Sequence, residues 1–383
     1  MHTKDHFSVI IDAVRSPIGV KKGKMVGMRA DDLMAQVIRA LLQRNTRLPK
    51  EKIEDVVIGC AFPEGVQGML MARGVSILAD LPVETGAKVV NRFCGSSMDA
   101  VHQIDYAINL NDCEAGIAGG VEDMFSIPIG GFNPSFHPEL YQKQYYIGMG
   151  ETAENLAREG NISREEQEEF AIASHRKALD AWQNGRFANE VVPVTYNGIK
   201  IDRDEGPREP DIEKIKSLEP AFLADGTITA ATSSPYSIGA AAVLLTSSTL
   251  AKELGLKPRA RIVSRAVAGV DWTRMGKGPL PATQKALQRA NLTLKDIDVI
   301  ELNEAFAAQS LYVIKKGGWP MEKVNLNGGA VALGHPLGCS GARILTTLLN
   351  VMEQRNARYG LAAMCIGGGQ GIATILERME ETL

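Results

Sequence analysis

Short apolar runs alternate with amphipathic segments along most of the chain. The apolar runs read VVIG at 56–59, VVN at 89–91 and GLAAMCI at 360–366, and each is continuous rather than alternating. Runs of this type are typical of strands buried on both faces, and the segments between them carry the apolar period of helices. The pattern therefore predicts an α/β protein in which helices cover buried sheets.

The helix-loop-strand pattern occurs twice, with similar amino-acid sequences. The segment LLQRNTRLPKEKIEDVVIGC, which ends at Cys60, is echoed by ALQRANLTLKDIDVIELN, which ends at Asn303. At nearly the same spacing, CGSSMDA from Cys94 corresponds to CSGARI from Cys339, and GIAGGVED corresponds to GLAAMCIG. Single segments of this kind resemble one another by chance, but four in the same order favour an internal duplication. We expect two similar α/β halves that share layers.

A region between the two halves has no counterpart in the repeat. It contains a Gly- and Pro-rich stretch, IPIGGFNPSFHPEL, then a long helix and a charged loop, DRDEGPREPD. The long helix is expected to begin after Ser163, because Ser163 and Glu166 form a capping box. The predicted organisation is an N-terminal half at 1–118, an inserted loop domain at 119–246 and a C-terminal half at 247–383.

Composition narrows the class of protein. The 383 residues, 45% of them hydrophobic, supply a large core or two packed units. Lys and Arg total 42 against 45 for Asp and Glu, and this near balance gives no basic field that would attract a nucleic acid. The 5 cysteines are scattered without a CxxC pair, so we expect neither a disulfide framework nor a metal site.

Neither end of the chain resembles a targeting segment. The apolar run in MHTKDHFSVIIDAV is too short for a signal peptide, and ERMEETL carries no peroxisomal or lipidation motif. No stretch approaches the roughly 18 uncharged apolar residues that a membrane helix needs. The sequence therefore favours a cytoplasmic protein without a membrane span.

Cys94 is the first candidate for chemistry. The run AKVVNRF stops at Cys94, small residues follow, and an amphipathic helix begins, which predicts a strand-to-helix turn. Free N–H groups and the positive end of a helix lower the pKa of a thiol at such a turn, and the thiolate is the reactive form. A buried structural cysteine fits the same local pattern. A nucleophile can be inferred only if Cys94 has partners.

Three other segments offer such partners. His335 lies between Gly334 and Pro336 in a loop of small residues that suits an exposed base, although glycine and proline also make ordinary turns. Cys365 leads into IGGGQG, whose backbone N–H groups can bind an oxyanion. This glycine-rich loop is not expected to bind a dinucleotide, because a dinucleotide-binding loop is followed by a helix, whereas GIATILE continues as a strand. Asn303 follows the strand VIEL, where an amide can orient a water or hold an oxyanion.

Together, these four segments resemble the thiolase family. NRFCGSSMDAVHQ is similar to its nucleophile segment, NEAFAAQ to its asparagine loop, NGGAVALGHPLGCSGAR to its histidine loop, and CIGGGQGIA to its second-cysteine loop. The resemblance extends from VIIDAVRSPIG to the C-terminus and is most detailed for the branch that serves bacterial fatty-acid oxidation. It implies a thiolase fold: two βαβαβαββ halves in a five-layered α-β-α-β-α core, with a loop domain inserted in the first.

The resemblance also implies catalytic roles. Cys94 would attack the 3-keto carbon of a 3-ketoacyl-CoA, with His335 keeping it as a thiolate, and Cys365 would protonate the acetyl-CoA enolate that leaves. His335 and a water bound to Asn303 would hold the enolate oxygen, while the N–H groups of Cys94 and Gly367 would form a second oxyanion hole. Coenzyme A, activated by His335, would take the acyl group as a co-substrate. No metal, nicotinamide or permanently bound cofactor is implied.

The resemblance also implies which residues contact the substrate, because they occupy the positions of substrate-binding residues in the family. Met149 matches a methionine that lines the family's pantetheine channel, Phe306 lies beside the reactive end, and Ser234 matches a serine in contact with coenzyme A. Arg208 lies in the charged loop that would meet the nucleotide end of coenzyme A. Each of these side chains also fits a plain packing role.

Two positions depart from the family pattern. The segment TAATSSPYSIGAAA has Ala231 where the family has glycine and Ile238 where it has aspartate. All four catalytic loops are intact. We therefore expect the change at Ile238 to alter how the insertion is anchored to the core, and not the chemistry.

The predicted activity is thiolysis of 3-ketoacyl-CoA to acetyl-CoA and a shortened acyl-CoA, as in fatty acid beta-oxidation. The main alternative is a biosynthetic acetyl-CoA C-acetyltransferase. Three other classes of protein fit the sequence less well. A ketoacyl synthase would not need Cys365, and a hydrolase would need a further group to activate water. A non-catalytic lipid-binding subunit would not need the four catalytic residues. The resemblance further implies a homodimer or a dimer of dimers, and a complex with a hydratase/dehydrogenase subunit. No motif encodes the acyl chain length.

Overall fold

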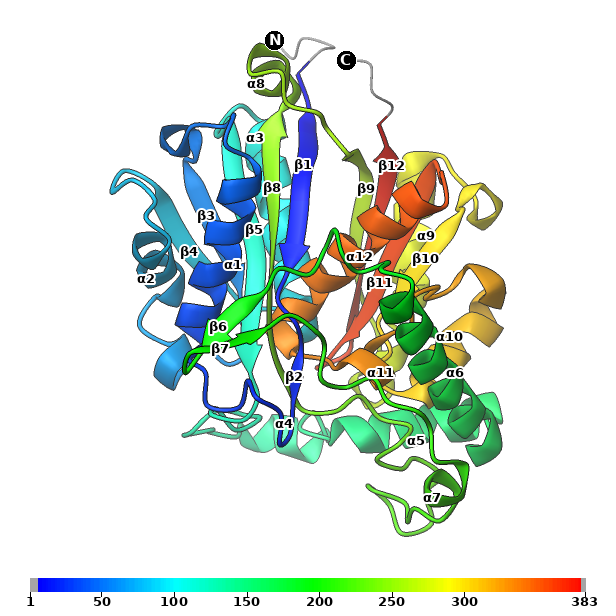
Figure 1. The fold of residues 1–383 in the computed structure, drawn as a ribbon. Helices are drawn as coiled ribbons and strands as arrows, with labels where there is room; N and C mark the ends of the chain where they lie inside the picture. Colours follow the sequence, from blue (N-terminus) through cyan, green and yellow to red (C-terminus); the bar gives the residue numbers. More distant parts are fainter. Residues whose placement is uncertain (1–5, 380–383) are drawn as a thin grey trace.

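A mixed sheet of 10 strands crosses the computed structural model, which describes residues 6–379 (Figure 1). Its order is β10-β11-β12-β9-β1-β8-β5-β3-β4, and the short β2 (Gly19–Val20) pairs with β8. One half contains β1 (Ser8–Arg15), β3 (Asp55–Gly59), β4 (Gly86–Val90), β5 (Ala115–Asp123) and β8 (Ser237–Ser247). The other contains β9 (Ala260–Gly269), β10 (Val299–Leu302), β11 (Tyr359–Ile366) and β12 (Gln370–Arg378). The halves meet where Ile10 of β1 pairs with Ala260 of β9.

The pairing pattern confirms the internal duplication. In the first half, β3 is parallel to β4 and β5, and β5, β8 and β1 follow antiparallel. In the second half, β10 is parallel to β11, and β11, β12 and β9 follow antiparallel. A parallel bridge from Ile300 to Val324 stands where the first half has β4. The corresponding segments that were read from the sequence therefore occupy corresponding strands.

Helices divide the two half-sheets into five layers. Two helices lie between the half-sheets: α3 (Ser96–Asn109) and α12 (Ser340–Gln354), whose side chains share one core cluster with both halves (Figure 1). Outside the first half-sheet pack α1 (Ala30–Arg44) and α2 (Met71–Leu78), and outside the second pack α9 (Pro279–Ala290) and α10 (Ala307–Gly317). Because α12 meets protein on every side, 13 of its residues are buried. The predicted five-layered α-β-α-β-α core is present.

The inserted region leaves the sheet at the end of β5 and returns at the start of β8. It contains α5 (Met149–Gly160), the long α6 (Arg164–Gln183), a hairpin of β6 (Val194–Tyr196) and β7 (Ile199–Ile201), and α7 (Ile212–Lys216). The capping box predicted at Ser163 is present, because Ser163 Oγ accepts from the Glu166 N–H. The flanking strands extend to Asp123 and from Ser237, so the excursion from the sheet covers 124–236. The division into three domains stays a prediction.

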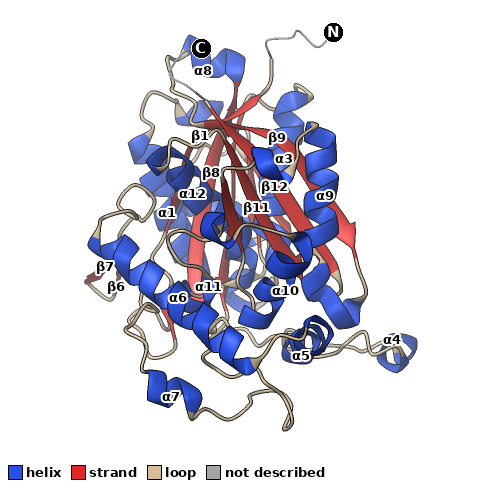
Figure 2. Ribbon diagram, turned by 90° about the vertical axis from the view of Figure 1, so that its right-hand side faces the viewer, coloured by secondary structure: helices blue, strands red, loops and turns tan. Residues whose placement is uncertain are grey.

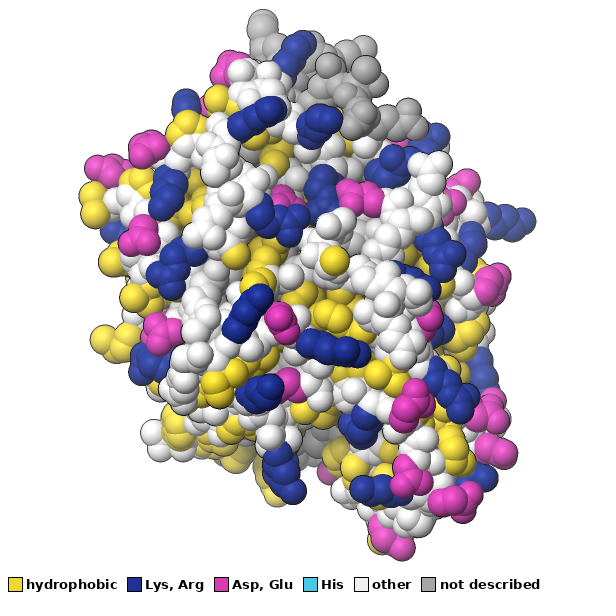
Figure 3. Space-filling view, in the orientation of Figure 1, with side chains coloured by type: hydrophobic (Ala, Val, Ile, Leu, Met, Phe, Trp, Pro, Cys, Tyr) yellow, Lys and Arg dark blue, Asp and Glu magenta, His cyan; other side chains and the backbone are white. Residues whose placement is uncertain are grey.

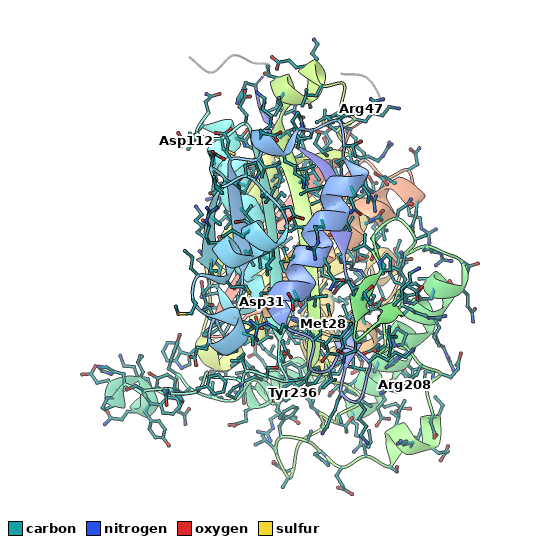
Figure 4. All side chains as sticks on the ribbon, turned by 60° about the vertical axis from the view of Figure 1, so that its left-hand side comes forward. Met28, Asp31, Arg47, Asp112, Arg208 and Tyr236 are labelled. Atoms are coloured by element: carbon teal, nitrogen blue, oxygen red, sulfur yellow. The ribbon has the colours of Figure 1, made fainter. Side chains whose placement is uncertain are left out.

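Residues 124–148 of the insertion form an arm that projects from the body of the molecule. Figures 2 and 4 show this arm, with α4 (Pro138–Gln142) at its far end, from two directions. Several of its apolar side chains are exposed: Ile129, Phe132, Phe136, Leu140 and Tyr141.

A buried ionic cluster anchors the insertion to the core. The Arg15 side chain, fully buried at the end of β1, donates to Glu190 at 2.7 Å and to Asp204 at 2.7 and 3.0 Å. Asp204 also accepts from the Ile18 N–H at 2.8 Å. Ile238, the departure from the family pattern, is buried at the start of β8 and pairs with Gly19 and Asp123. Its effect on anchoring stays a prediction.

Charge and hydropathy on the surface follow the composition. Figure 3 shows Lys and Arg side chains intermixed with Asp and Glu over the face that it presents, as the near balance of charges implies. Within residues 6–379, no helix is both long and apolar enough to cross a membrane. The terminal residues on which the targeting predictions partly rest, 1–5 and 380–383, lie outside the described chain.

Candidate active site

Cys94 lies in a tight turn between β4 and α3, as predicted. The chain leaves β4 at Val90, passes through a 3-10 turn (Phe93–Gly95) and enters α3 at Ser96. Phe93 has a φ of +43°, a left-handed conformation that a phenylalanine adopts only when its surroundings impose it. Ser96 Oγ holds the turn by accepting from the Arg92 N–H at 2.8 Å and donating to the Phe93 carbonyl at 2.6 Å.

The protonation state of Cys94 differs from the sequence prediction. Burial raises the pKa of the Cys94 thiol to about 11, and the charge of Glu122 adds to the shift. The N–H groups of Gly367 and of Cys94 itself act in the opposite direction, as the turn predicts, but burial outweighs them. Cys94 is therefore a neutral thiol at neutral pH. Its two N–H contacts are the same pair that the resemblance implies for an oxyanion hole.

Cys365 lies near Cys94, on a strand from the other half of the chain. It occupies the end of β11, and the tight turn 367–369 connects it to β12. Gly368 and Gly369 have φ of +78° and +81°, so this turn requires glycine. Burial and the neighbouring Cys94 both raise the pKa of the Cys365 thiol. The site thus contains two adjacent thiols that are both protonated at neutral pH.

His335 follows the short helix α11 (Ala330–Leu333) and Gly334, whose φ is +115°. Its backbone N–H donates to Ser237 Oγ at 3.1 Å, and its ring contacts Ser340 through Nδ1 and Asn303 through Nε2. Burial, assisted by the positive charge of Arg343, lowers the pKa of His335 to about 3. The imidazole is therefore neutral across the physiological range and can act as a base.

Asn303 is fixed at the end of β10, where the sequence placed it. Its N–H donates to the Ala363 carbonyl at 3.0 Å, and its Nδ2 lies 3.4 Å from His335 Nε2. Its Oδ1 is buried and has no hydrogen-bond partner among the described residues, which leaves it for a water or a substrate. The neighbouring Glu304 carboxylate holds this loop by accepting from Ser174 Oγ at 2.7 Å and from the Val331 N–H at 3.1 Å.

Glu122 joins the two halves at the site and was missed in the sequence. Its buried carboxylate accepts from the Ala61 N–H at 2.7 Å in the first half and from the Gly338 N–H at 2.8 Å in the histidine loop. A Cβ on Gly338 would lie 2.6 Å from Glu122 Oε2 and 2.6 Å from Cys60 Cα, so only glycine fits there. The available signal was the pair of acidic residues, Glu122 and Asp123, that ends the otherwise apolar strand GIAGGVED.

The first turns of α3 and α12 also contact each other. Ser97 Oγ accepts from the Ala342 N–H at 2.8 Å, and a Cβ on Gly341 would lie 2.4 Å from the Met98 N. Because Cys94 lies two residues before α3 and His335 lies five residues before α12, this contact brings their loops to the same region. The structure therefore gathers Cys94, His335, Asn303, Cys365 and Gly367 at one end of the central layer.

The residues implied to contact coenzyme A lie around this cluster. Met149, at the start of α5, is adjacent to Gly367, because a Cβ there would lie 3.4 Å from Met149 Sδ. Phe306 packs in one cluster with Cys365 and Met149 and makes an edge contact with Phe222, with ring centroids 5.7 Å apart. Ser234 lies beside the asparagine loop, since its Oγ donates to the Ala305 carbonyl at 2.9 Å.

Arg208 lies farther out, on the surface of the inserted region. Its side chain is exposed, and its backbone N–H donates to His175 Nδ1 at 3.4 Å. Figure 4 places Arg208 at the same end of the molecule as Tyr236 and Met28. The segment from Ser234 to Tyr236 leads into β8, so Arg208 and Ser234 belong to the same end of the fold.

Known proteins resemble this chain over nearly its whole length. The models described as thiolase N-terminal domain and thiolase C-terminal domain match residues 8–249 and 256–378. The 3-ketoacyl-CoA thiolase of Shewanella loihica is 51% identical over 97% of this chain and 99% of its own length. The 3-ketoacyl-CoA thiolase of Vibrio parahaemolyticus is 50% identical over 97% and 98%.

A solved structure shows the same architecture. The acetyl-CoA acetyltransferase of Bacillus anthracis superposes with a TM-score of 0.89 at 37% identity, covering 98% of this chain and 99% of the other. Two family models thus span nearly the whole chain, and relatives of equal length share half of its residues. The protein is therefore an acyltransferase that belongs to the thiolase family.

Proposed function

We propose that this protein is a 3-ketoacyl-CoA thiolase, which cleaves 3-ketoacyl-CoA with coenzyme A into acetyl-CoA and an acyl-CoA two carbons shorter. The observation that carries the proposal is a pair of protonated thiols, Cys94 and Cys365, close enough for the charge of one to raise the pKa of the other, in a site that also holds the neutral imidazole of His335. A nucleophile with a second thiol as proton donor suits carbon–carbon cleavage, because the leaving carbanion needs a proton. Relatives of that name at about 50% identity support the same substrate class.

The first half of the reaction forms an acyl-enzyme. As Cys94 Sγ attacks the 3-keto carbon, its proton passes to His335 Nε2, and the N–H groups of Cys94 and Gly367 stabilise the oxyanion. The C2–C3 bond then breaks, its electrons form the acetyl-CoA enolate, and Cys365 gives its proton to C2. Asn303, through a water, and His335 stabilise the enolate oxygen. Acetyl-CoA leaves, and the acyl group stays on Cys94.

The second half restores every proton. The protonated His335 gives its proton to the Cys365 thiolate, which restores both groups. Incoming coenzyme A then gives its thiol proton to His335 and attacks the acyl group, and His335 passes that proton to Cys94 as its thiolate leaves. Coenzyme A is a co-substrate in this scheme. Met149, Phe306 and Ser234 are proposed to line its path to Cys94, with Arg208 near its nucleotide end.

A condensing acetyltransferase is the second candidate, favoured by the likeness to the Bacillus anthracis enzyme. Both candidates are tested by giving the purified protein coenzyme A with 3-ketoacyl-CoA of C4, C8 or C16 chain length. We expect mass spectrometry to detect acetyl-CoA and the acyl-CoA two carbons shorter from the longer substrates. Cleavage of the C4 substrate alone would favour the acetyltransferase, and no cleavage of any substrate would favour a non-catalytic lipid-binding role.

We also propose that the protein forms a homodimer through the β4 edge of the sheet. β4 ends the strand order, so one side of it offers unpaired backbone groups. Apolar side chains are exposed on the elements that flank it, α2 with its preceding loop, the 79–85 loop and α3: Met69, Leu70, Ile77, Val83, Tyr106 and Leu110. Such a patch beside an open strand edge favours a symmetric interface with a second copy.

Gel filtration with light scattering tests the dimer. The native chain is expected to elute at twice its mass of 41.3 kDa. Ile77→Glu places a charge in the proposed interface and should shift the protein toward the monomer, whereas Ile199→Glu, at an exposed position on the β6–β7 hairpin, should not. A native protein that elutes as a monomer would contradict this proposal. A complex with a hydratase/dehydrogenase subunit and a cytoplasmic location stay predictions from the sequence.

A further inference from the structure

Ser340, the first residue of α12, contacts the ring of His335 inside the site. We propose that Ser340 is a positioning residue that holds His335 in the tautomer with a protonated Nδ1 and an unprotonated Nε2. Only that tautomer can take the proton of Cys94 through Nε2. This role rests on the proposed function of His335 as the base and adds a residue on which that function depends.

The hydroxyl group of Ser340 carries one hydrogen, and the structure directs it away from the imidazole. Ser340 Oγ donates to the Pro336 carbonyl at 2.9 Å and lies 2.5 Å from His335 Nδ1. Because the hydroxyl hydrogen is donated to the Pro336 carbonyl, Ser340 Oγ can only accept a hydrogen bond from the His335 ring. Nδ1 must therefore bear the hydrogen and donate it to Ser340. Both side chains are buried, so water does not compete for either group.

The acceptor for the Ser340 hydroxyl is itself fixed. The Pro336 carbonyl also accepts from the N–H groups of Cys339 and Ser340, each at 3.0 Å, in the turn that starts α12. The carbonyl therefore cannot rotate away from the hydroxyl without breaking the start of the helix. The contact to His335 is thus built into the same local structure that begins α12.

The other side of the ring supports the same tautomer. Asn303 Nδ2, an amide donor, lies 3.4 Å from His335 Nε2. A hydrogen on Nε2 would set two donors against each other, whereas a lone pair on Nε2 can accept. Arg343 and burial exclude the doubly protonated ring at neutral pH. Two independent neighbours therefore place the single ring hydrogen on Nδ1.

Loss of the hydroxyl would release this constraint. In Ser340→Ala, the Nδ1 hydrogen has no acceptor on that side, so the tautomer with hydrogen on Nε2 becomes populated and cannot serve as the base. We expect kcat for thiolysis to fall roughly 10- to 100-fold with KM changed less than about twofold, because the change affects proton transfer and not substrate binding. Ser340→Thr keeps the hydroxyl and should recover most of kcat.

Thr346→Ala provides the matched control. Thr346 lies on the same helix, is fully buried, and its hydroxyl donates to the Ala342 carbonyl four residues earlier, as Ser340 does to Pro336. It is not among the hydrogen-bond partners of His335. A general effect of losing a buried hydroxyl from α12 would lower kcat in both variants, whereas the proposed role predicts a loss in Ser340→Ala alone.

Nitrogen NMR of protein labelled with ¹⁵N-histidine measures the tautomer directly. His335→Gln identifies the His335 signals. In the native protein we expect Nδ1 to be protonated and Nε2 unprotonated, with the Nε2-protonated form appearing in Ser340→Ala. A native His335 with hydrogen on Nε2 would overturn the proposal, as would an unchanged kcat in Ser340→Ala. The spectrum needs no substrate, so it tests the role of Ser340 even if thiolysis is not detected. If the alanine variant does not fold, the spectrum of the native protein alone still shows which ring nitrogen of His335 is protonated.

Discussion

Cys94→Ala is expected to lower the rate of 3-ketoacyl-CoA thiolysis by at least about 10⁴-fold, because it removes the atom that forms the acyl-enzyme. In the native protein, mixing with 3-ketoacyl-CoA in the absence of coenzyme A should leave one acyl group on Cys94. Intact-protein mass spectrometry detects this adduct, and peptide mapping locates it. Neither the adduct nor the cleavage products are expected from the alanine variant.

Cys113→Ala is the matched control for this loss. Cys113 is also a free cysteine, buried just before β5, and its Sγ donates to the Ala115 carbonyl at 3.1 Å. Its replacement removes a free thiol at a position outside the site, so the thiolysis rate should stay within about twofold of the native rate. If Cys94→Ala cleaved the substrate at the native rate, the assignment of the nucleophile and the proposed function would both be wrong.

Cys365→Ser is expected to separate the two proton-transfer roles of the site. A serine hydroxyl is a far weaker acid than a thiol, so protonation of the leaving enolate should slow and kcat for thiolysis should fall roughly 10²- to 10⁴-fold. Cys94 and His335 remain, so acetyl-CoA should still transfer its acetyl group to Cys94. The variant is thus expected to form the acetyl-enzyme without efficient carbon–carbon cleavage.

Deuterium exchange tests this separation without a full turnover. In heavy water, the native enzyme should exchange the hydrogens on C2 of acetyl-CoA, because Cys365 removes and returns them, and mass spectrometry follows the gain in mass. Cys365→Ser should lose this exchange while retaining the acetyl adduct. Exchange at the native rate in Cys365→Ser would assign the proton transfer to another group and contradict the role proposed for Cys365.

The protonation states of the catalytic pair show how far local sequence reasoning extends. The turn at Cys94 and the N–H groups within it follow from small residues between a strand and a helix, and the structure confirms both. The expectation that this turn lowers the pKa of Cys94 was wrong, because burial raises that pKa by more than the N–H groups lower it. Burial equally keeps His335 neutral. The resting pair is a thiol and an imidazole, and the proton moves only when substrate is attacked.

Sequence alone determined the features that depend on near neighbours. The apolar runs predicted strands, and burial was correct for β3 and β11 but wrong for β4, which forms the edge of the sheet and is partly exposed. The capping box located the start of α6 after Ser163, and the repeated sequence pattern predicted two halves with the same strand pairing. These features are local because strand and helix periods and capping bonds join residues only a few positions apart. The motifs around Cys94, His335, Asn303 and Cys365 likewise could be read without coordinates.

Tertiary structure decided the features that join distant residues. Glu122 accepts from the Gly338 N–H, Arg15 pairs with Asp204, and Cys365 is close enough to Cys94 for the two thiols to influence each other's charge, although each pair is far apart in the chain. Ser340 is near His335 in sequence, but its effect depends on a buried rotamer and on a carbonyl held by the start of α12. Burial and hydrogen-bond direction arise only when the layers pack, so they set the pKa values and the proposed tautomer that the motifs by themselves left open.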